Sequence, residues 1–564
     1  MVSPMTVVRV AAVQLAATED VAANLASAVR LVEEAAAQGA QLVVLPEFGN
    51  HVSWYADRDH ARRMAQTLDG DFVRTLAATA AEHRLHLLVN CTLSREDGRT
   101  TGSNILIGPD GAILATSDKQ VLMGSERDHL DPATEASPVV DTELGRLGLY
   151  SCMDGVINET PRMLAVDGAQ VLLNSLNSFA LDEASLHVPV RAVENRVWVI
   201  AANKVGPLVP EHSIEAVATA VGVPVERLHG AGESQIVAPD GTVVARGPLS
   251  GEAVVVADID VSLADDKRRP DGTDVLAVRR PELYGPIVAP PHGRRAPAGA
   301  PEVVTAVVCP GEGDDVLALV REAVAGGAQL VVLPELAAWS GGVAGEGSTP
   351  SFATDALRDA LAGSSATAVT SVREDDQHVG LAVDAGGVVL RQPQLHASAR
   401  HAAWATRLGD ALEVVDLPWG RLAVVVGDDA LHPETFRLAS LQDADVVAVP
   451  FTTAAAHDLD LLLLERSAEN RLNVAVASRP GSHGAGMLVP LSADFTLWSG
   501  GWQFAGVISR PRPVLADGPL TVATLSPEQA SNRLVSRGTD VVDGRPWALA
   551  ATLVRPSELS DASI

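Results

Sequence analysis

The sequence predicts an α/β protein that contains two domains of the same architecture. Its 564 residues are too many for one hydrophobic core and suit two domains of roughly 250 residues each. Apolar runs typical of strands alternate with runs typical of helices along both halves, as expected for sheets covered by helices. The stretch GAQLVVLPE stands at 39–47 and again at 327–335, so one architecture is expected twice.

The first half opens with a strand, a helix and a second strand. The apolar run at 7–15 predicts a strand, and 18–39 predicts a helix because Thr18 or Asp20 can cap its start and Gly39 suits the position after its end. The continuous apolar run at 40–47 predicts a strand covered on both faces. Further strands are expected at 85–93, 103–116 and 145–152, hairpin turns at 109–111 and 239–241, and a helix at 158–168.

The second half repeats this order. Residues 145–162 are matched by 420–437, and 191–196 by 466–471, with an offset of 275 residues in both cases (420 − 145 and 466 − 191). The tetrapeptide GTDV at 272–275 recurs at 538–541. A segment rich in Pro, Gly and Ala at 288–301 predicts a linker between domains at 1–287 and 302–555.

Composition and charge exclude several classes of function. The formal net charge of −29 argues against a nucleic-acid partner. The N-terminus, with Arg9 inside its apolar run, is a poor signal peptide, and no run approaches the ~18 apolar residues of a membrane span, so no membrane association and a cytoplasmic location are expected. Three cysteines without a CxxC pair predict neither a disulfide framework nor a thiolate metal site, and no metal is expected.

Three residues of the first half are candidates for chemistry. Glu47 ends a buried strand, Lys119 is one of three lysines in the chain, and Cys152 closes a strand just before a predicted helix. A thiol beside a helix N-terminus and a cation is expected to have a depressed pKa. Each residue alone has a structural alternative: an ion pair, a surface lysine, or a small buried side chain.

Taken together, these residues resemble the nitrilase, or carbon–nitrogen hydrolase, superfamily. The motifs are LVVLPEF around Glu47, SDKQVLMGSE around Lys119 and GLYSCMDG around Cys152, and the resemblance extends over 5–287. It implies that each domain is a four-layer α-β-β-α sandwich. It also implies that the two domains pack as an intramolecular pseudo-dimer, with further homo-oligomerisation left open.

The resemblance also implies roles for the site residues. Glu47 is the general base, Lys119 stabilises the oxyanion together with the backbone N–H of Met153, Cys152 is the nucleophile, and Glu126 is an auxiliary carboxylate. No cofactor is required. The order Cys152-Met153-Asp154 favours a small amide or N-carbamoyl substrate over a nitrile. A nitrilase, a thioester acyltransferase and a non-catalytic scaffold remain alternatives.

Two further expectations concern the pocket and the second half. Residues 206–234 are longer than a plain connection and are expected to cover the pocket as a lid, and no role is given to His187, His212 or His229. In the second half Glu335 is retained, but Gln392 aligns with Lys119, the region of Ala399 with Glu126, and Gly427 with Cys152. The second domain is therefore predicted to be non-catalytic, with Glu335 held only by packing.

Overall fold

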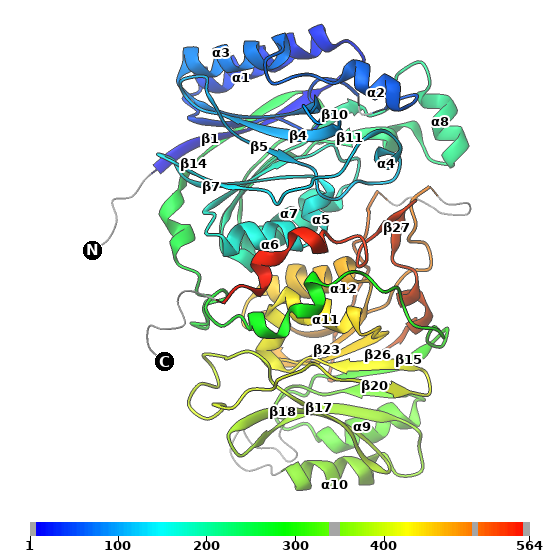
Figure 1. Cartoon of the computed structure of the whole chain (residues 1–564). Coiled ribbons are helices and arrows are strands. Elements are labelled where there is room, and N and C mark those ends of the chain that lie inside the picture. Colours follow the sequence, from blue (N-terminus) through cyan, green and yellow to red (C-terminus); the bar gives the residue numbers. More distant parts are fainter. Residues whose placement is uncertain (1–6, 53, 338–349, 499–505, 557–564) are drawn as a thin grey trace.

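A computed structural model describes residues 7–52, 54–337, 350–498 and 506–556. The two halves are stacked, and in each half two sheets lie between an outer and an inner layer of helices (Figure 1). Among the described residues no helix has the length and hydropathy to cross a bilayer. The outer helices are α1 (Val21–Ala37) and α3 (Asp71–His83) in the first half and α9 (Val316–Ala325) and α10 (Pro350–Ala360) in the second; the inner helices are α6 (Glu159–Val166) and α7 (Val188–Asn195), which face α11 (Pro433–Leu441) and α12 (Leu463–Asn470).

The first half contains an eight-stranded and a six-stranded sheet. Their orders are β11-β10-β1-β2-β3-β4-β5, with β14 also paired to β1, and β13-β12-β9-β8-β7-β6. The first sheet comprises β1 (Val7–Ala16), β2 (Leu42–Val44), β3 (His86–Ser94), β4 (Thr100–Ile107), β5 (Ile113–Asp118), β10 (Lys204–Pro207), β11 (His229–Ala231) and β14 (Ala253–Asp260). The second comprises β6 (Val139–Thr142), β7 (Gly145–Ser151), β8 (Val171–Ser175), β9 (Trp198–Ala202), β12 (Gln235–Val237) and β13 (Val243–Arg246).

The second half contains two six-stranded sheets, in the orders β19-β18-β17-β16-β15-β26 and β20-β21-β22-β23-β24-β25. The three central strands of each are parallel, as are β1-β2-β3 and β7-β8-β9 in the first half. The strands are β15 (Val303–Val308), β16 (Leu330–Val332), β17 (Thr367–Glu374), β18 (Gln377–Asp384), β19 (Gly387–Pro393), β20 (Val414–Leu417), β21 (Gly420–Val424), β22 (Val446–Pro450), β23 (Asn473–Gly481), β24 (Gly484–Val489), β25 (Val514–Leu515) and β26 (Leu520–Leu525).

Local sequence explains how the first elements form. The Asp20 carboxylate, not the Thr18 hydroxyl, caps α1 by accepting from the N–H groups of Ala22 and Ala23. Gly39 follows the helix with φ +84°, a conformation that a side chain would strain. Apolar side chains of α1 and α3 pack on the outer face of the first sheet, and a second apolar layer fills the space between the sheets. The predicted helices and hairpins of this half are confirmed.

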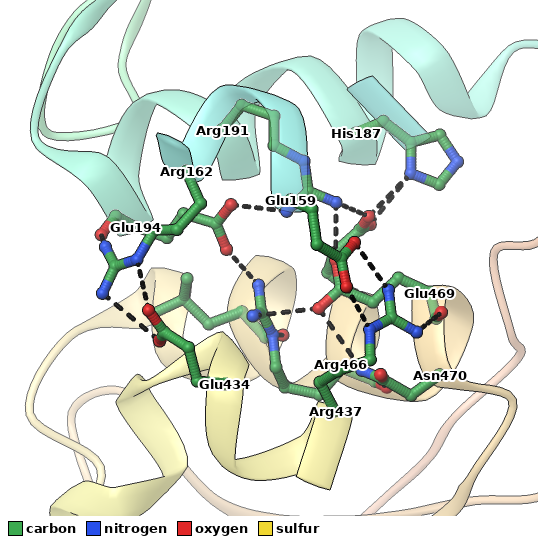
Figure 2. A network of polar contacts seen from close by, with 12 residues as sticks. Glu159, Arg162, His187, Arg191, Glu194, Glu434, Arg437, Arg466, Glu469 and Asn470 are labelled. Carbon is green, nitrogen blue, oxygen red and sulfur yellow. Dashed lines mark hydrogen bonds and ion pairs between the residues drawn. The ribbon is translucent and has the colours of Figure 1, made fainter. Parts of the chain in front are cut away.

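Buried ion pairs join the inner helices of the two halves (Figure 2). Arg162 Nε lies 2.9 Å from Glu434 Oε1, and Arg437 Nε lies 2.7 Å from Glu159 Oε1. Arg162 and Arg437 are 275 positions apart, as are Glu159 and Glu434 (437 − 162 and 434 − 159), so the two pairs are reciprocal. Arg191 and Arg466 repeat the pattern by contacting Glu469 and Glu194 across the interface. Because removing one partner of such a pair leaves a charge buried alone, each half depends on the other's charges.

A second reciprocal contact involves the repeated tetrapeptide GTDV. Thr539 Oγ1, in the hairpin of β27 (Leu534–Ser536) and β28 (Thr539–Asp540), accepts a hydrogen bond of 3.0 Å from Gly124 N–H. Thr273 Oγ1 accepts one of 3.2 Å from Ala399 N–H. Each half therefore supports, with its own last segment, a loop of the other half.

Candidate active site

A buried lysine between two carboxylates forms the centre of the candidate site. Glu47 follows β2 and is fully buried, and Lys119 follows β5, the last strand of the same sheet. Lys119 Nζ lies 2.9 Å from Glu47 Oε1 and 2.8 Å from Glu126 Oε1. Glu126 begins the short helix α4 (Glu126–His129), and its other oxygen accepts from Met123 N–H at 2.8 Å. The structure thus brings these three predicted residues together.

Cys152 lies in a tight turn between β7 and the short helix α5 (Met153–Val156). Its φ is +47°, which is uncommon for a residue with a side chain and typical of a constrained functional position. The turn is held because Cys152 N–H donates to Ser175 O at 3.0 Å. Met153 is the first residue of α5, where a backbone N–H has no partner within the helix.

Asp154 joins the cysteine turn to the lysine loop. Its buried carboxylate accepts from Val121 N–H at 2.7 Å and Gln120 N–H at 3.1 Å, next to Lys119. The aspartate of the Cys-x-Asp order therefore positions the cation relative to the thiol.

Burial dominates the electrostatics of the site. It raises the pKa of Glu47 to about 7, although the Lys119 ammonium opposes the shift. Burial, followed by the Glu47 charge, raises the pKa of the Cys152 thiol well above its usual value. The expected depressed thiol pKa is therefore wrong, because burial and the Glu47 charge outweigh the opposing effect of the Lys119 ammonium. A protonated thiol needs a base, and Glu47 titrates in the range suited to one.

Sequence reasoning missed a second buried lysine near the site. Lys204 is the first residue of β10, is 1% exposed, and donates from Nζ to His51 O at 3.0 Å. Burial lowers the pKa of Lys204 to about 7, against the attraction of Glu47 and Cys152. The rarity of lysine could have pointed to Lys204, since only three lysines occur in the chain.

A cavity of about 370 Å³ opens onto Cys152 and Glu126, and both halves line it. The 206–234 segment, which contains α8 (Ile214–Val221), contributes apolar side chains to its wall. His187 lies instead between the halves, with Nδ1 2.9 Å from Glu465, and His212 is exposed; these two and His229 are absent from the lining. The lining includes Leu208, Val209, Val217, Val221 and Leu228 from that segment and Leu497, Trp498, Ser536 and Arg537 from the second half.

In the second half, the residues that correspond to Lys119 and Glu126 are not those that the sequence alignment predicted. The Asp429 carboxylate accepts from Leu395 and His396 N–H, both at 2.8 Å, as Asp154 accepts from Gln120 and Val121. Gln394, not Gln392, therefore occupies the lysine position, because Gln392 lies earlier, paired with Gly380 in the sheet. By the same offset of 275 residues (394 − 119), His401 rather than Ala399 corresponds to Glu126, and Arg400 corresponds to Ser125.

Glu335 is held by charge and not only by packing. Arg400 Nη1 lies 2.5 Å from Glu335 Oε1, and this cation lowers the pKa of Glu335 to about 2. Gly427 has φ +52°, and a side chain there would begin 2.5 Å from Glu335 Oε2. The carboxylate thus fills the place that a thiol would need.

Glu335, His378 and His401 form the one group in the described part of the chain that could hold a metal, with donor atoms within 4.8 Å of one another. Both ring nitrogens of His378 already have partners at 2.7 Å, Gln394 Oε1 and Ser371 Oγ. Arg400 occupies one oxygen of Glu335. Because His378 has no free ring nitrogen, this group fits an internal hydrogen-bond network better than a three-ligand metal site.

Comparison with known proteins agrees with the first-half geometry. Residues 9–269 match the carbon-nitrogen hydrolase family. A nitrilase from Pyrococcus abyssi is 29% identical over 262 residues, covering 46% of this chain and 92% of the relative. The omega-amidase NIT2 of Danio rerio is 29% identical over 293 residues, covering 50% of this chain and 97% of the relative. A hydrolase from Pseudomonas protegens (named for the pqqF 5' region) is 30% identical, covering 47% and 86%. The chain is a member of the carbon-nitrogen hydrolase family.

Proposed function

We propose that the first half hydrolyses the C–N bond of a small amide or N-carbamoyl compound through a thioester on Cys152. One observation carries this proposal: the buried Lys119 ammonium lies within 2.9 Å of both Glu47 and Glu126, and Asp154, two residues after Cys152, holds the backbone that directly follows Lys119. A nucleophile, a base and a fixed cation are what acyl transfer from an amide needs.

Acylation begins with the protonated thiol. Glu47 accepts the Cys152 proton as sulfur attacks the carbonyl carbon, and the carbonyl electron pair moves to oxygen. The Lys119 ammonium and the Met153 N–H stabilise this oxyanion. When the tetrahedral intermediate collapses, the C–N bond breaks and Glu47 returns the proton to the leaving nitrogen. Ammonia or an amine departs, and the thioester remains.

Deacylation uses the same groups with water. Glu47 accepts a proton from water as the water oxygen attacks the thioester carbon. The Lys119 ammonium and the Met153 N–H stabilise the second oxyanion. Collapse breaks the C–S bond, and the proton returns to the Cys152 sulfur. Glu126 keeps the lysine protonated and oriented throughout, because it shares that ammonium with Glu47.

The substrate class is inferred from the order Cys152-Met153-Asp154 and from the omega-amidase relative. The nitrilase relative makes a nitrile the competing substrate. Acyl transfer to an amine is a further outcome, since the same thioester can be taken by another nucleophile.

We also propose that the second half, 302–555, is a non-catalytic copy of the first domain, 1–287, and replaces a partner subunit. The matched strand orders and the reciprocal pairs Arg162–Glu434 and Arg437–Glu159 support this proposal. An interface between like surfaces is self-complementary, as these contacts are.

A substrate panel tests the proposed reaction. Full-length protein is assayed for ammonia release from amides, N-carbamoyl amino acids and nitriles, and intact mass is used to trap the acyl adduct. Cys152→Ala is expected to abolish turnover and the adduct, while Cys309→Ala, a buried cysteine of the second half, retains both. Competition with hydroxylamine separates hydrolysis from acyl transfer. Turnover of nitriles alone, or an active Cys152→Ala variant, would contradict the proposal.

A further inference from the structure

We propose that this site selects amides with an uncharged, apolar acyl group, and that Leu497 and Trp498 of the second half form the selecting wall. This inference rests on the proposed amidohydrolase function and names its substrate class. It follows from the composition of the cavity, from the way the wall is held, and from the partners of the charged lining residues.

Most of the side chains that line the cavity are apolar, and they come from both halves. Phe179 of the first half and Trp498 of the second meet edge to face, with ring centroids 5.3 Å apart. Leu497 and Val217 add aliphatic surface to the same cavity. A cavity of about 370 Å³ lies at the low end of the range for small-molecule sites, so an acyl chain that fills it contacts this wall.

The charged side chains of the lining already have partners. Glu126 binds Lys119 at 2.8 Å. Arg537 forms an ion pair with Asp128 and its side chain is 68% exposed, so water screens its charge. A carboxylate or ammonium on the acyl chain would therefore lose its hydration among the described residues without gaining a new counter-ion, which is unfavourable.

A backbone contact holds the wall beside the cavity. Leu497 N–H donates to Val535 O at 2.8 Å, which ties Leu497 to the β27–β28 hairpin, and Ser536 and Arg537 of this hairpin also line the cavity. The second half thus presents an apolar surface to the substrate, and its contribution to the enzyme includes specificity.

Matched substrates test the inference on the full-length protein. Hexanamide and the monoamide of adipic acid have the same chain length and differ by one carboxylate. We expect kcat/KM for hexanamide to exceed that for the adipic monoamide by at least tenfold. Trp498→Ala and Leu497→Ala should each lower kcat/KM for hexanamide about tenfold, mainly by raising KM. The same variants should change kcat/KM for propanamide by less than about twofold. Trp547→Ala, a partly buried second-half tryptophan outside the lining, is the matched control.

A gain-of-charge variant guards against a folding artefact. Trp498→Arg adds a cation to the wall and should reduce the preference for hexanamide over the adipic monoamide at least tenfold. Equal or better turnover of the adipic monoamide by the wild type, lost in Arg537→Ala, would overturn the inference and identify Arg537 as a carboxylate receptor. An equal decrease of kcat/KM for propanamide and for hexanamide in Trp498→Ala and Leu497→Ala would also overturn the inference.

A binding measurement separates this inference from the reaction. Calorimetric titration of the full-length Cys152→Ala variant with hexanamide and with the adipic monoamide reports the preference without turnover. If no amide is hydrolysed, the proposed function fails, yet tighter binding of hexanamide still supports the apolar site. If amides are hydrolysed but the adipic monoamide binds as tightly, the proposed function stands and the inference fails.

Discussion

Glu47 and Glu335 follow equivalent strands, β2 and β16, in the two halves, but their pKa values are shifted in opposite directions. The pKa of Glu47 is raised to about 7, whereas that of Glu335 is lowered to about 2. Both carboxylates are buried, and each belongs to the last residue of the identical stretch GAQLVVLPE. Glu47 shares Lys119 with Glu126, whereas Glu335 shares Arg400 with Asp428. Both cations are shared, so the difference between the two carboxylates follows from the identity of the cation and from the other charges around each of them.

The first prediction concerns this pair of glutamates and carries the largest effect. Glu47→Gln should lower kcat/KM by roughly 10²–10⁴-fold because the amide cannot accept the thiol proton. Glu335→Gln should leave kcat/KM within about twofold while lowering stability, since Arg400 loses one of its two carboxylate partners and keeps only Asp428. Steady-state kinetics at pH 8 check both variants. A comparable loss of activity in Glu335→Gln would mean that the second half takes part in catalysis.

The second prediction concerns the reciprocal ion pairs. Glu434→Gln should lower the free energy of unfolding by about 3–5 kcal/mol, because it leaves Arg162 and Arg279 buried without this carboxylate. Glu159→Gln should cost less, since one arginine, Arg437, pairs with Glu159. Urea unfolding measures both. Asp258→Asn, in an exposed pair with Arg9, is the control and should leave the free energy of unfolding almost unchanged, because water screens this pair. Small losses in both interface variants would argue against interdependent halves.

The third prediction concerns pH. Since the pKa of Glu47 is about 7, kcat/KM should fall about tenfold per unit as pH drops below 7, when this base becomes protonated. Glu335 has a depressed pKa, so it stabilises the fold above its unfolded pKa of about 4.3, and this contribution is lost as pH falls towards 2. A pH–rate profile and acid unfolding of wild type and Glu335→Gln measure the two effects. A flat rate between pH 5 and 8 would exclude Glu47 as the base.

The fourth and smallest effect concerns the two GTDV threonines. Thr539→Ala removes the acceptor for Gly124 N–H and should cost about 1–3 kcal/mol of stability. Because that loop leads to Glu126, kcat/KM should also fall severalfold. Thr273→Ala, which removes the equivalent acceptor for Ala399 N–H, should lower stability without changing kcat/KM. Differential unfolding and kinetics of the pair test this; equal kinetic effects would contradict it.

Much of the fold could be predicted because it depends on local patterns. Asp20 and Gly39 bound a helix by their own backbone preferences, and apolar runs mark strands wherever both faces are covered. The internal offset predicted that Gly427 stands where the first half has Cys152, and Gly427 lies beside Glu335 in the structure. That the second half is non-catalytic stays a prediction. The lysine position was misplaced by two residues, because sequence similarity is weak there and the contact of Asp429 with the following backbone defines the register.

Residue identity alone thus indicated a carbon–nitrogen hydrolase, its candidate Glu47, Lys119 and Cys152, and a second half without a cysteine at the matching turn. The tertiary structure decided the direction of each pKa, the partner of each buried charge and the wall of the cavity. These properties arise from groups far apart in the chain: Thr539 supports the Glu126 loop, and Trp498 lies over the Cys152 pocket. Burial and charge act through space, so only the folded chain brings them together.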